Sequence, residues 1–261
     1  MKKILQIGLI LSLFTSIHTL SAHDLKGAVA SDDRSPKNII RDNHRNPLET
    51  LSFFGIESDM VIVELSPGGG WYTEILANFI HYPGTLIAAH FSSDSDRAYY
   101  KRSRSNFEKK MASDSMYGRV EIVDLDSELS DPNTVDAVLT FRNLHNWLGP
   151  TMDSIFSNTH KALKPGGIFG VVEHRAKPGT SMDMMRKSGY VTESHAIAIA
   201  EKHGFELVAK SEINANPKDL KDHPKGVWTL PPNLRLKETD KEKYLEIGES
   251  DRMTLLFRKP I

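Results

Sequence analysis

The chain has 261 residues, of which 39% are hydrophobic and 26% are charged, as is usual for one soluble globular domain with a sizeable core. Its formal net charge of −1 speaks against a nucleic-acid partner held by bulk electrostatics. The sequence contains no cysteine, which excludes disulfides, thiolate metal sites and a cysteine nucleophile.

The first residues have the layout of a secretory signal. Lys2 and Lys3 precede an apolar run at 4–17, and a small-residue stretch at 19–22 follows it. The run is shorter than the roughly 20 apolar residues that a spanning helix needs, and polar residues interrupt it. We therefore expect a cleaved signal over 1–22, with an uncleaved anchor as the alternative. The exported protein would be periplasmic or secreted and would keep no stable membrane span.

Strand and helix signals alternate along the rest of the chain. Residues 23–35 are polar and are expected to be flexible, and a single domain is predicted over 36–261, beginning with a helix at 36–54. Strands are predicted at 60–64, 85–90, 120–123, 135–141, 168–173, 205–211 and 253–258, with helices at 72–80, 152–163 and 192–203. Such alternation predicts an α/β fold with a doubly wound, mostly parallel sheet.

The stretch at 214–250 differs from the alternating pattern. It is polar and contains four prolines, so it is predicted to be mostly loop. Loops of this length are uncommon unless they are functional or disordered.

The strongest functional signal is a glycine turn between the strand at 60–64 and the helix at 72–80. The strand ends on Glu64, and the turn consists of Ser66, Pro67, Gly68, Gly69, Gly70 and Trp71. Glycine permits positive φ and close approach of a ligand, and the helix N-terminus favours a carboxylate or phosphate. A valine at Gly69 should therefore disturb both the backbone and the ligand. The alternative is a plain turn that needs glycine for its geometry alone.

This stretch resembles motif I of class I S-adenosylmethionine-dependent methyltransferases, in which an acid precedes three glycines at alternate positions. Glu64 takes the acidic position, Ser66 replaces the first glycine, and Gly68 and Gly70 match the others. The resemblance covers most of the chain after residue 36. It implies a Rossmann-like seven-stranded sheet with an antiparallel last strand, and S-adenosylmethionine as the cofactor.

The resemblance also implies cofactor contacts at the ends of later strands. The position that grips the ribose falls at His90, where the family often has an acid. The position near the adenine falls at Asp124, with Leu125 beside it, although a solvated turn carboxylate is an equal alternative for Asp124. Arg142 and Asn143 follow the strand at 135–141 and resemble a pair found in quinone-pathway methyltransferases.

Two histidines are candidate acid/base groups. His145 follows the strand at 135–141, and His174 ends the strand at 168–173. The carboxyl ends of strands are where an open α/β sheet builds its site, and a histidine there could act as a general base or orient an acceptor hydroxyl. Structural packing is the alternative for both. The phrases at 141–147 and 172–175 are similar to those of exported bacterial proteins described as predicted methyltransferases.

Other chemistries lack their motifs in this sequence. No recognisable histidine or carboxylate spacing predicts a dedicated metal site, and no serine-hydrolase elbow or phosphate-binding loop is present. We expect methyl transfer from S-adenosylmethionine to a small-molecule or lipid-like acceptor. An exported binding protein of the same fold without catalysis is the main alternative. A nicotinamide oxidoreductase is disfavoured by the missing acid at the second strand.

Overall fold

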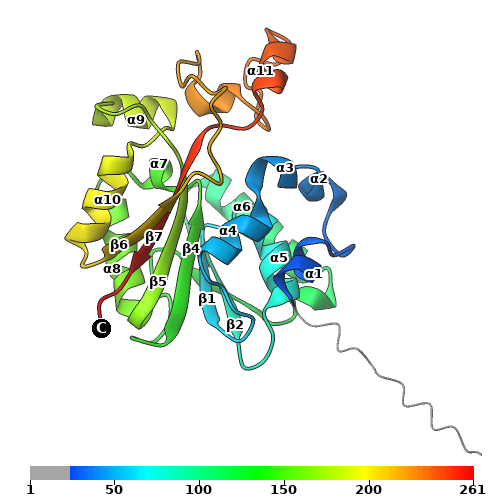
Figure 1. The fold of residues 1–261 in the computed structure, drawn as a ribbon. Helices are drawn as coiled ribbons and strands as arrows, with labels where there is room; N and C mark the ends of the chain where they lie inside the picture. The colour runs from blue at the N-terminus through cyan, green and yellow to red at the C-terminus, as the bar shows by residue number, and fades with distance from the viewer. Residues whose placement is uncertain (1–23) are drawn as a thin grey trace, which may run out of the picture.

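The computed structural model describes residues 24–261, so the predicted signal at 1–22 lies outside the described residues. A seven-stranded sheet with the order β3-β2-β1-β4-β5-β7-β6 forms the centre of the molecule (Figure 1). The strands are β1 (Val61–Leu65), β2 (Thr85–His90), β3 (Val120–Asp124), β4 (Val135–Phe141), β5 (Leu163–His174), β6 (Glu206–Ser211) and β7 (Arg252–Arg258). β7 pairs antiparallel with both β5 and β6, and the other pairings are parallel. The predicted fold is confirmed.

Helices cover both faces of the sheet (Figure 1). They are α1 (Leu25–Val29), α2 (Pro36–Ile39), α3 (Asp42–Arg45), α4 (Pro47–Phe53), α5 (Trp71–Phe79), α6 (Ala98–Met111), α7 (Leu144–Trp147), α8 (Pro150–Ala162), α9 (Met182–Ser188), α10 (Glu193–Lys202) and α11 (Lys241–Ile247), with the 3₁₀ turns η1 (Ser115–Tyr117) and η2 (Gly226–Thr229). Among residues 24–261, none of the helices combines the length and apolar character that crossing a membrane requires.

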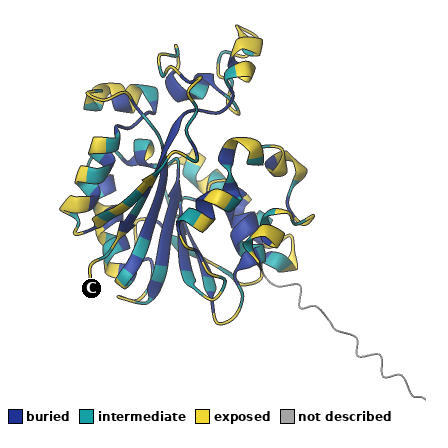
Figure 2. Ribbon diagram, in the orientation of Figure 1, coloured by how far each residue is buried: buried dark blue, intermediate teal, exposed yellow. Residues whose placement is uncertain are grey.

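The sheet separates two apolar cores because successive strand residues point to opposite faces. In β4, Val138 joins the core under α8 and α10, whereas Ala137 and Leu139 join the core under α4 and α5. The central strands are therefore buried over almost their whole length (Figure 2). This explains why they read as continuous apolar runs in the sequence.

The N-terminal region differs from its prediction. The segment at 23–35 was expected to be flexible. Over its described residues it contains α1, which packs against α5, and the buried Arg34, which forms a two-pronged ion pair with Asp42, at 2.7 and 2.8 Å. The single helix expected at 36–54 is divided into α2, α3 and α4. Asn46 adopts a left-handed φ of 42° before Pro47, and a residue that precedes proline is disfavoured in the helical conformation.

The predicted loop at 214–250 is mostly irregular, with η2 and α11 as its short helical parts. Buried polar residues hold it in place. Asp219 accepts hydrogen bonds from the Tyr190 hydroxyl and the Asp251 backbone N–H, and Asn214 donates to the hydroxyls of Thr50 and Thr254. The loop therefore lies as a fixed wall beyond the sheet, opposite α2 and α3 (Figure 1).

Candidate active site

A cavity of about 800 Å³ lies at the carboxyl ends of β1, β4 and β5. One wall comes from α2 and α3, and the opposite wall comes from the loop that contains η2. The lining residues fall within the segments 37–45, 66–71, 141–145, 227–233 and 249–250, together with His174. An open α/β sheet is expected to place its ligand at this edge.

The glycine turn forms the floor of this cavity, with an alternating backbone conformation. Ser66, Gly68 and Gly70 have left-handed φ angles of 50°, 60° and 76°. These are the positions at which the motif repeats its small residues. Gly69 does not have a positive φ, so the prediction that a valine at this position would disturb the backbone is wrong. A side chain there would obstruct only the cavity.

The turn has features that fit S-adenosylmethionine. A Cβ built at Gly68 or Gly69 would meet nothing within 4 Å, so the backbone is open to close approach. The Ser66 hydroxyl is buried and has no hydrogen-bond partner among residues 24–261. Such a group is normally satisfied by protein, water or a ligand. Gly70 serves packing instead, because its Cβ would lie 3.2 Å from the Lys110 ammonium of α6.

Glu64 lies beneath the turn and not in the cavity lining. Its carboxyl accepts a 2.6 Å hydrogen bond from the Thr73 hydroxyl and so joins β1 to α5. Burial raises the pKa of Glu64 to about 7, against the smaller opposing effects of Thr73 and Lys110.

The three residues predicted for the ribose and adenine end have other partners. The ring of His90 is buried, with Nε2 3.2 Å from the Gly68 carbonyl and Nδ1 accepting from the next backbone N–H. Burial lowers the pKa of His90, so the neutral ring braces the turn. Asp124 pairs with Arg104 at 2.7 Å, and Leu125 packs in the core. In this arrangement these three described residues lie outside the cavity lining.

Asn143 and Pro67 line the cavity beside the turn. The Asn143 amide donates to the carbonyls of Leu65 and Ser66, at 3.1 and 3.2 Å. This side chain therefore joins the carboxyl end of β4 to that of β1 and holds the turn in position.

Trp71 also lines the cavity, at the start of α5. Its indole N–H donates to the Asn38 carbonyl at 2.9 Å, and the Arg45 guanidinium lies 4.6 Å from the ring centroid. Trp71 thus attaches the N-terminal helices to the glycine turn.

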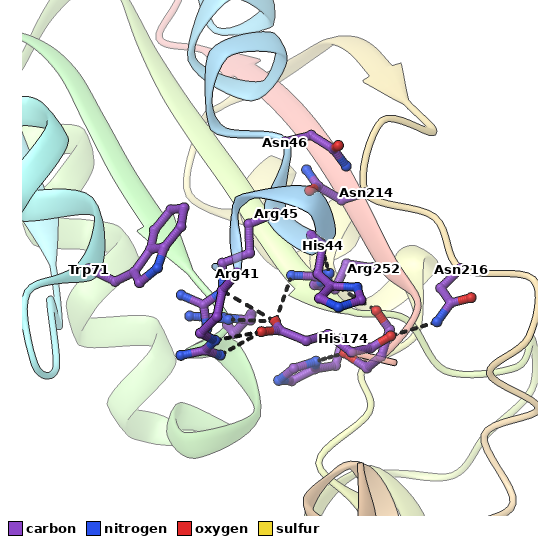
Figure 3. Close-up of polar contacts among 12 residues, drawn as sticks. Arg41, His44, Arg45, Asn46, Trp71, His174, Asn214, Asn216 and Arg252 are labelled. Atoms are coloured by element: carbon purple, nitrogen blue, oxygen red, sulfur yellow. Dashed lines mark hydrogen bonds and ion pairs between the residues drawn. The ribbon is translucent and has the colours of Figure 1, made fainter. Parts of the chain in front are cut away.

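Arg142 belongs to a group of four arginines around one carboxylate, which we call the arginine cluster. The guanidinium nitrogens of Arg41, Arg45, Arg142 and Arg252 lie 2.7, 3.2, 3.4 and 3.4 Å from the oxygens of Glu249. Figure 3 shows Arg41, Arg45 and Arg252 converging from separate parts of the chain. Burial alone would raise the pKa of Glu249, but the guanidinium groups, Arg45 foremost, lower it to about 2.

The two candidate acid/base histidines lie side by side, with ring centroids 5.2 Å apart. His145 Nδ1 is 3.0 Å from a carboxylate oxygen of Glu173. Because an ionised carboxylate only accepts, Nδ1 carries the proton and Nε2 keeps its lone pair. His174 Nδ1 is 2.5 Å from the Ser250 hydroxyl. Burial lowers the pKa of His174 well below its usual value, and the positive charge of Arg142 adds to this effect.

His145, Glu173 and His174 also bring three possible metal ligands within 4.8 Å of one another. The sequence predicted no metal site because one ligand is distant from the other two along the chain. The positive charges of Arg142, Arg252 and Arg45 act on His174. They oppose a cation at this position.

Sequence reasoning missed Glu173 and most of the arginine cluster. Glu173 was recognisable, because it precedes His174 at the end of a strand that adjoins β4. The cluster had no local signal, because its members come from α2–α3, the end of β4 and the start of β7.

Comparison with known proteins agrees with this geometry. Residues 63–171 match a family described as "Methyltransferase domain". A sterol 24-C-methyltransferase of Neurospora crassa is 24% identical over 221 residues, which cover 78% of this chain and 53% of that protein. The chain spans about half the length of the curated relatives it matches.

Two solved structures share the fold. An S-adenosylmethionine-dependent methyltransferase from Aquifex aeolicus has a TM-score of 0.58 at 14% identity, covering 90% of this chain and 98% of that one. A geranyl diphosphate C-methyltransferase from Streptomyces coelicolor also has a TM-score of 0.58, at 12% identity, covering 91% of this chain and 85% of that one. Residues 63–171 therefore match a methyltransferase domain, and the chain shares the fold of S-adenosylmethionine-dependent methyltransferases.

Proposed function

We propose that the protein transfers a methyl group from S-adenosylmethionine to a small-molecule or lipid-like acceptor, with His145 as the general base. The observation that carries this proposal is His145, which lines the same cavity as the open glycine turn and is held by the buried Glu173 behind it. The cofactor cradle and the proton acceptor thus line one cavity.

Ser66, Gly68 and Gly69 are the residues that would hold the cofactor, which supplies an activated methyl group on a sulfonium when bound. His145 would take the proton released by the acceptor onto Nε2. Glu173 fixes the tautomer and orientation of the ring and stabilises the imidazolium that forms, which makes it a positioning residue.

The proposed acceptor class has two supports. The names of two similar proteins give a sterol and geranyl diphosphate as the methylated compounds. In this chain, Val227, Trp228 and Pro231 place apolar side chains on the cavity wall opposite the N-terminal helices. An apolar wall of this kind suits a lipid-like acceptor.

Export is part of the proposal. It depends on the signal predicted over 1–22, and membership of the exported bacterial methyltransferase group depends on the phrases at 141–147 and 172–175. Intact-mass measurement of protein recovered outside the cytoplasm tests it. Loss of residues 1–22 is expected, whereas a mass that includes them would mean an anchor.

Binding is tested first, by calorimetry with S-adenosylmethionine, S-adenosylhomocysteine and NAD. The two sulfur ligands should bind and NAD should not. No response to either sulfur ligand at millimolar concentration would refute the proposal. Labelled cofactor then identifies acceptors among sterol, prenyl diphosphate and phenolic extracts.

Turnover of His145→Ala tests the base. We expect a fall of roughly 10²–10⁴-fold, with affinity for S-adenosylhomocysteine within about twofold of the parent. His195→Ala, on α10 and outside the cavity lining, is the matched control. Parent-like turnover of folded His145→Ala would remove this residue from the mechanism. Cofactor binding without turnover of any acceptor by the parent would favour the binding-protein alternative.

A further inference from the structure

The arginine cluster carries more positive charge than its protein partners neutralise. Four guanidinium groups share the carboxylate of Glu249, which leaves three positive charges without an anionic partner among the described residues. The neighbouring carboxylates are engaged elsewhere, since Asp42 pairs with Arg34 and Asp251 pairs with Arg175. Buried charges are costly unless they are paired, so this surplus requires an explanation.

The surplus charge faces the cavity. Arg41, Arg45 and Arg142 all contribute to its lining. The Arg45 side chain is 3% exposed, and its Nη1 is buried without a hydrogen-bond partner among residues 24–261. A buried donor left unpaired is destabilising, and an anion in the cavity would satisfy it.

The backbone is also strained at Arg142, which is a member of the cluster. Arg142 has a left-handed φ of 64°, which is unfavourable for a residue with a Cβ. Its neighbour Asn143 is fixed by the carbonyls of Leu65 and Ser66. Backbone strain at such a position is typical of a functional site.

We infer that the arginine cluster binds an oxyanion carried by the methyl acceptor, and that this oxyanion is a phosphate or diphosphate ester. The inference depends on the proposed function for the identity of the acceptor. A phosphate monoester carries about 1.5–2 negative charges at pH 7, so it offsets the surplus better than a carboxylate does, and a diphosphate offsets more. Planar guanidinium groups also match phosphate oxygens in pairs.

The position of the cluster suits an acceptor that extends toward the base. Ser250 follows Glu249 and contacts His174, whose ring adjoins that of His145. An acceptor with its phosphate at the arginines would therefore direct its remaining atoms along the wall that holds the proposed base.

The carboxylate of the cofactor is the other source of an oxyanion in this cavity. S-adenosylmethionine also carries an ammonium and a sulfonium, so its net charge is positive. It would leave the surplus of the cluster in place, and this favours an anion from the acceptor.

Calorimetry of the exported chain with inorganic pyrophosphate tests the inference in the presence of EDTA. We expect binding to the parent and at least a tenfold loss of affinity in Arg41→Gln, because a hydrogen bond to a charged group is among the stronger ones. Arg41 is the variant of choice because its side chain is 21% exposed, and Arg142→Gln is the second. Arg102→Gln, exposed on α6, is the matched control and should stay within twofold.

Parallel titrations separate the sources of the anion. S-adenosylhomocysteine should bind Arg41→Gln and the parent alike. If Arg41→Gln loses affinity for it but not for 5′-methylthioadenosine, which lacks the amino-acid portion, the cluster holds the cofactor carboxylate and the inference is overturned. Acetate that binds as tightly as pyrophosphate would refute the phosphate assignment.

Three further results would also decide the matter. Pyrophosphate binding that appears only with added Mg²⁺ would mean a metal-bridged anion and overturn direct binding by the arginines. Absence of any pyrophosphate response beside normal S-adenosylhomocysteine binding would overturn the inference and leave the proposed function standing. Pyrophosphate binding without cofactor binding would support the anion site and refute the proposed function.

Discussion

A buried carboxylate lies near each end of the cavity, and the pKa values of the two are shifted in opposite directions. Glu64, beneath the glycine turn, is 2% exposed, and burial raises its pKa to about 7. Glu249, in the arginine cluster, is 4% exposed, and the surrounding guanidinium groups lower its pKa to about 2. Since burial is nearly equal, the partners decide the outcome. The Thr73 hydroxyl and the charge of Lys110 oppose the effect of burial on Glu64 only in part, whereas four guanidinium charges outweigh it at Glu249.

The chain also builds the two ends differently. Glu64 and its partner Thr73 are nine positions apart, within a single strand–turn–helix unit. The arginine cluster joins α2–α3, β4 and β7, so Arg45 and Glu249 are 204 positions apart. A nearly neutral ligand cradle can therefore be specified by one short stretch of sequence, whereas a cluster of charges forms only when the whole chain folds.

The largest effect is expected for Glu249→Gln. Removing the shared carboxylate leaves the four arginines, of which Arg45 and Arg252 are buried, without an anionic partner. This should lower the free energy of unfolding by about 3–5 kcal/mol. Chemical denaturation at pH 7 measures it. Glu238→Gln, whose side chain is 84% exposed, is the control and should change stability by less than about 0.5 kcal/mol. Equal stability of the two variants would contradict the view that the Glu249 carboxylate holds the arginine cluster together.

Acid titration of the parent examines the same group. The depressed pKa of Glu249 means that its contribution is complete above the unfolded value of 4.5 and is lost as pH falls through about 2. Its size is about 3 kcal/mol. The Glu249→Gln variant should lack this loss of stability between pH 4.5 and about 2.

Glu64→Gln should show the opposite pH dependence. Between pH 4.5 and about 7 the folded protein keeps a proton on Glu64 that the unfolded chain releases, so parent stability falls as pH rises through this range and is then constant. The variant should gain about 3 kcal/mol relative to the parent between pH 4.5 and 8. Denaturation curves at both pH values measure this, with the exposed Glu57→Gln as control. A difference that is independent of pH would mean that Glu64 is ionised in the folded protein.

Gly68→Ala and Gly69→Ala form a matched pair that tests the backbone of the turn. A Cβ meets nothing within 4 Å at either position, but Gly68 has a φ of 60° and Gly69 has no positive φ. Gly68→Ala should lower stability by about 1–2 kcal/mol, whereas Gly69→Ala should be neutral or slightly stabilising. Thermal unfolding without ligand separates them, and equal losses would contradict the alternating conformation.

Ser66→Gly should have the smallest effect, and it should raise stability while lowering affinity for the cofactor. Glycine relieves the left-handed backbone and removes a buried unpartnered hydroxyl, so stability should rise by about 0.5–1 kcal/mol. Affinity for S-adenosylhomocysteine should fall by roughly 2–10-fold, because the hydrogen bond that we assign to this hydroxyl is lost. Calorimetry beside thermal unfolding measures both, and unchanged affinity would place the hydroxyl outside the cofactor site.

Much of the framework was predictable from local patterns. The strands at 85–90 and 135–141 agree with β2 and β4 at both ends, because short apolar runs between turn residues report burial on both faces. The glycine turn was recognisable for the same reason, since acid, small residues and helix start lie in one continuous stretch. The candidate bases followed from the rule that sites lie at the carboxyl ends of strands.

What the sequence by itself determined about this protein is the sheet, the turn and the edge at which a ligand would lie, because each depends on neighbours along the chain. The tertiary structure decided which polar side chains form hydrogen bonds or ion pairs within the protein and so are not free to bind a ligand. Because α6 packs against the sheet, Asp124 forms an ion pair with Arg104, and His90 contacts the Gly68 carbonyl of the turn. It also decided the charge of the cavity, because electrostatic interactions depend on distance in space, and α3 and β7 meet only in the folded chain.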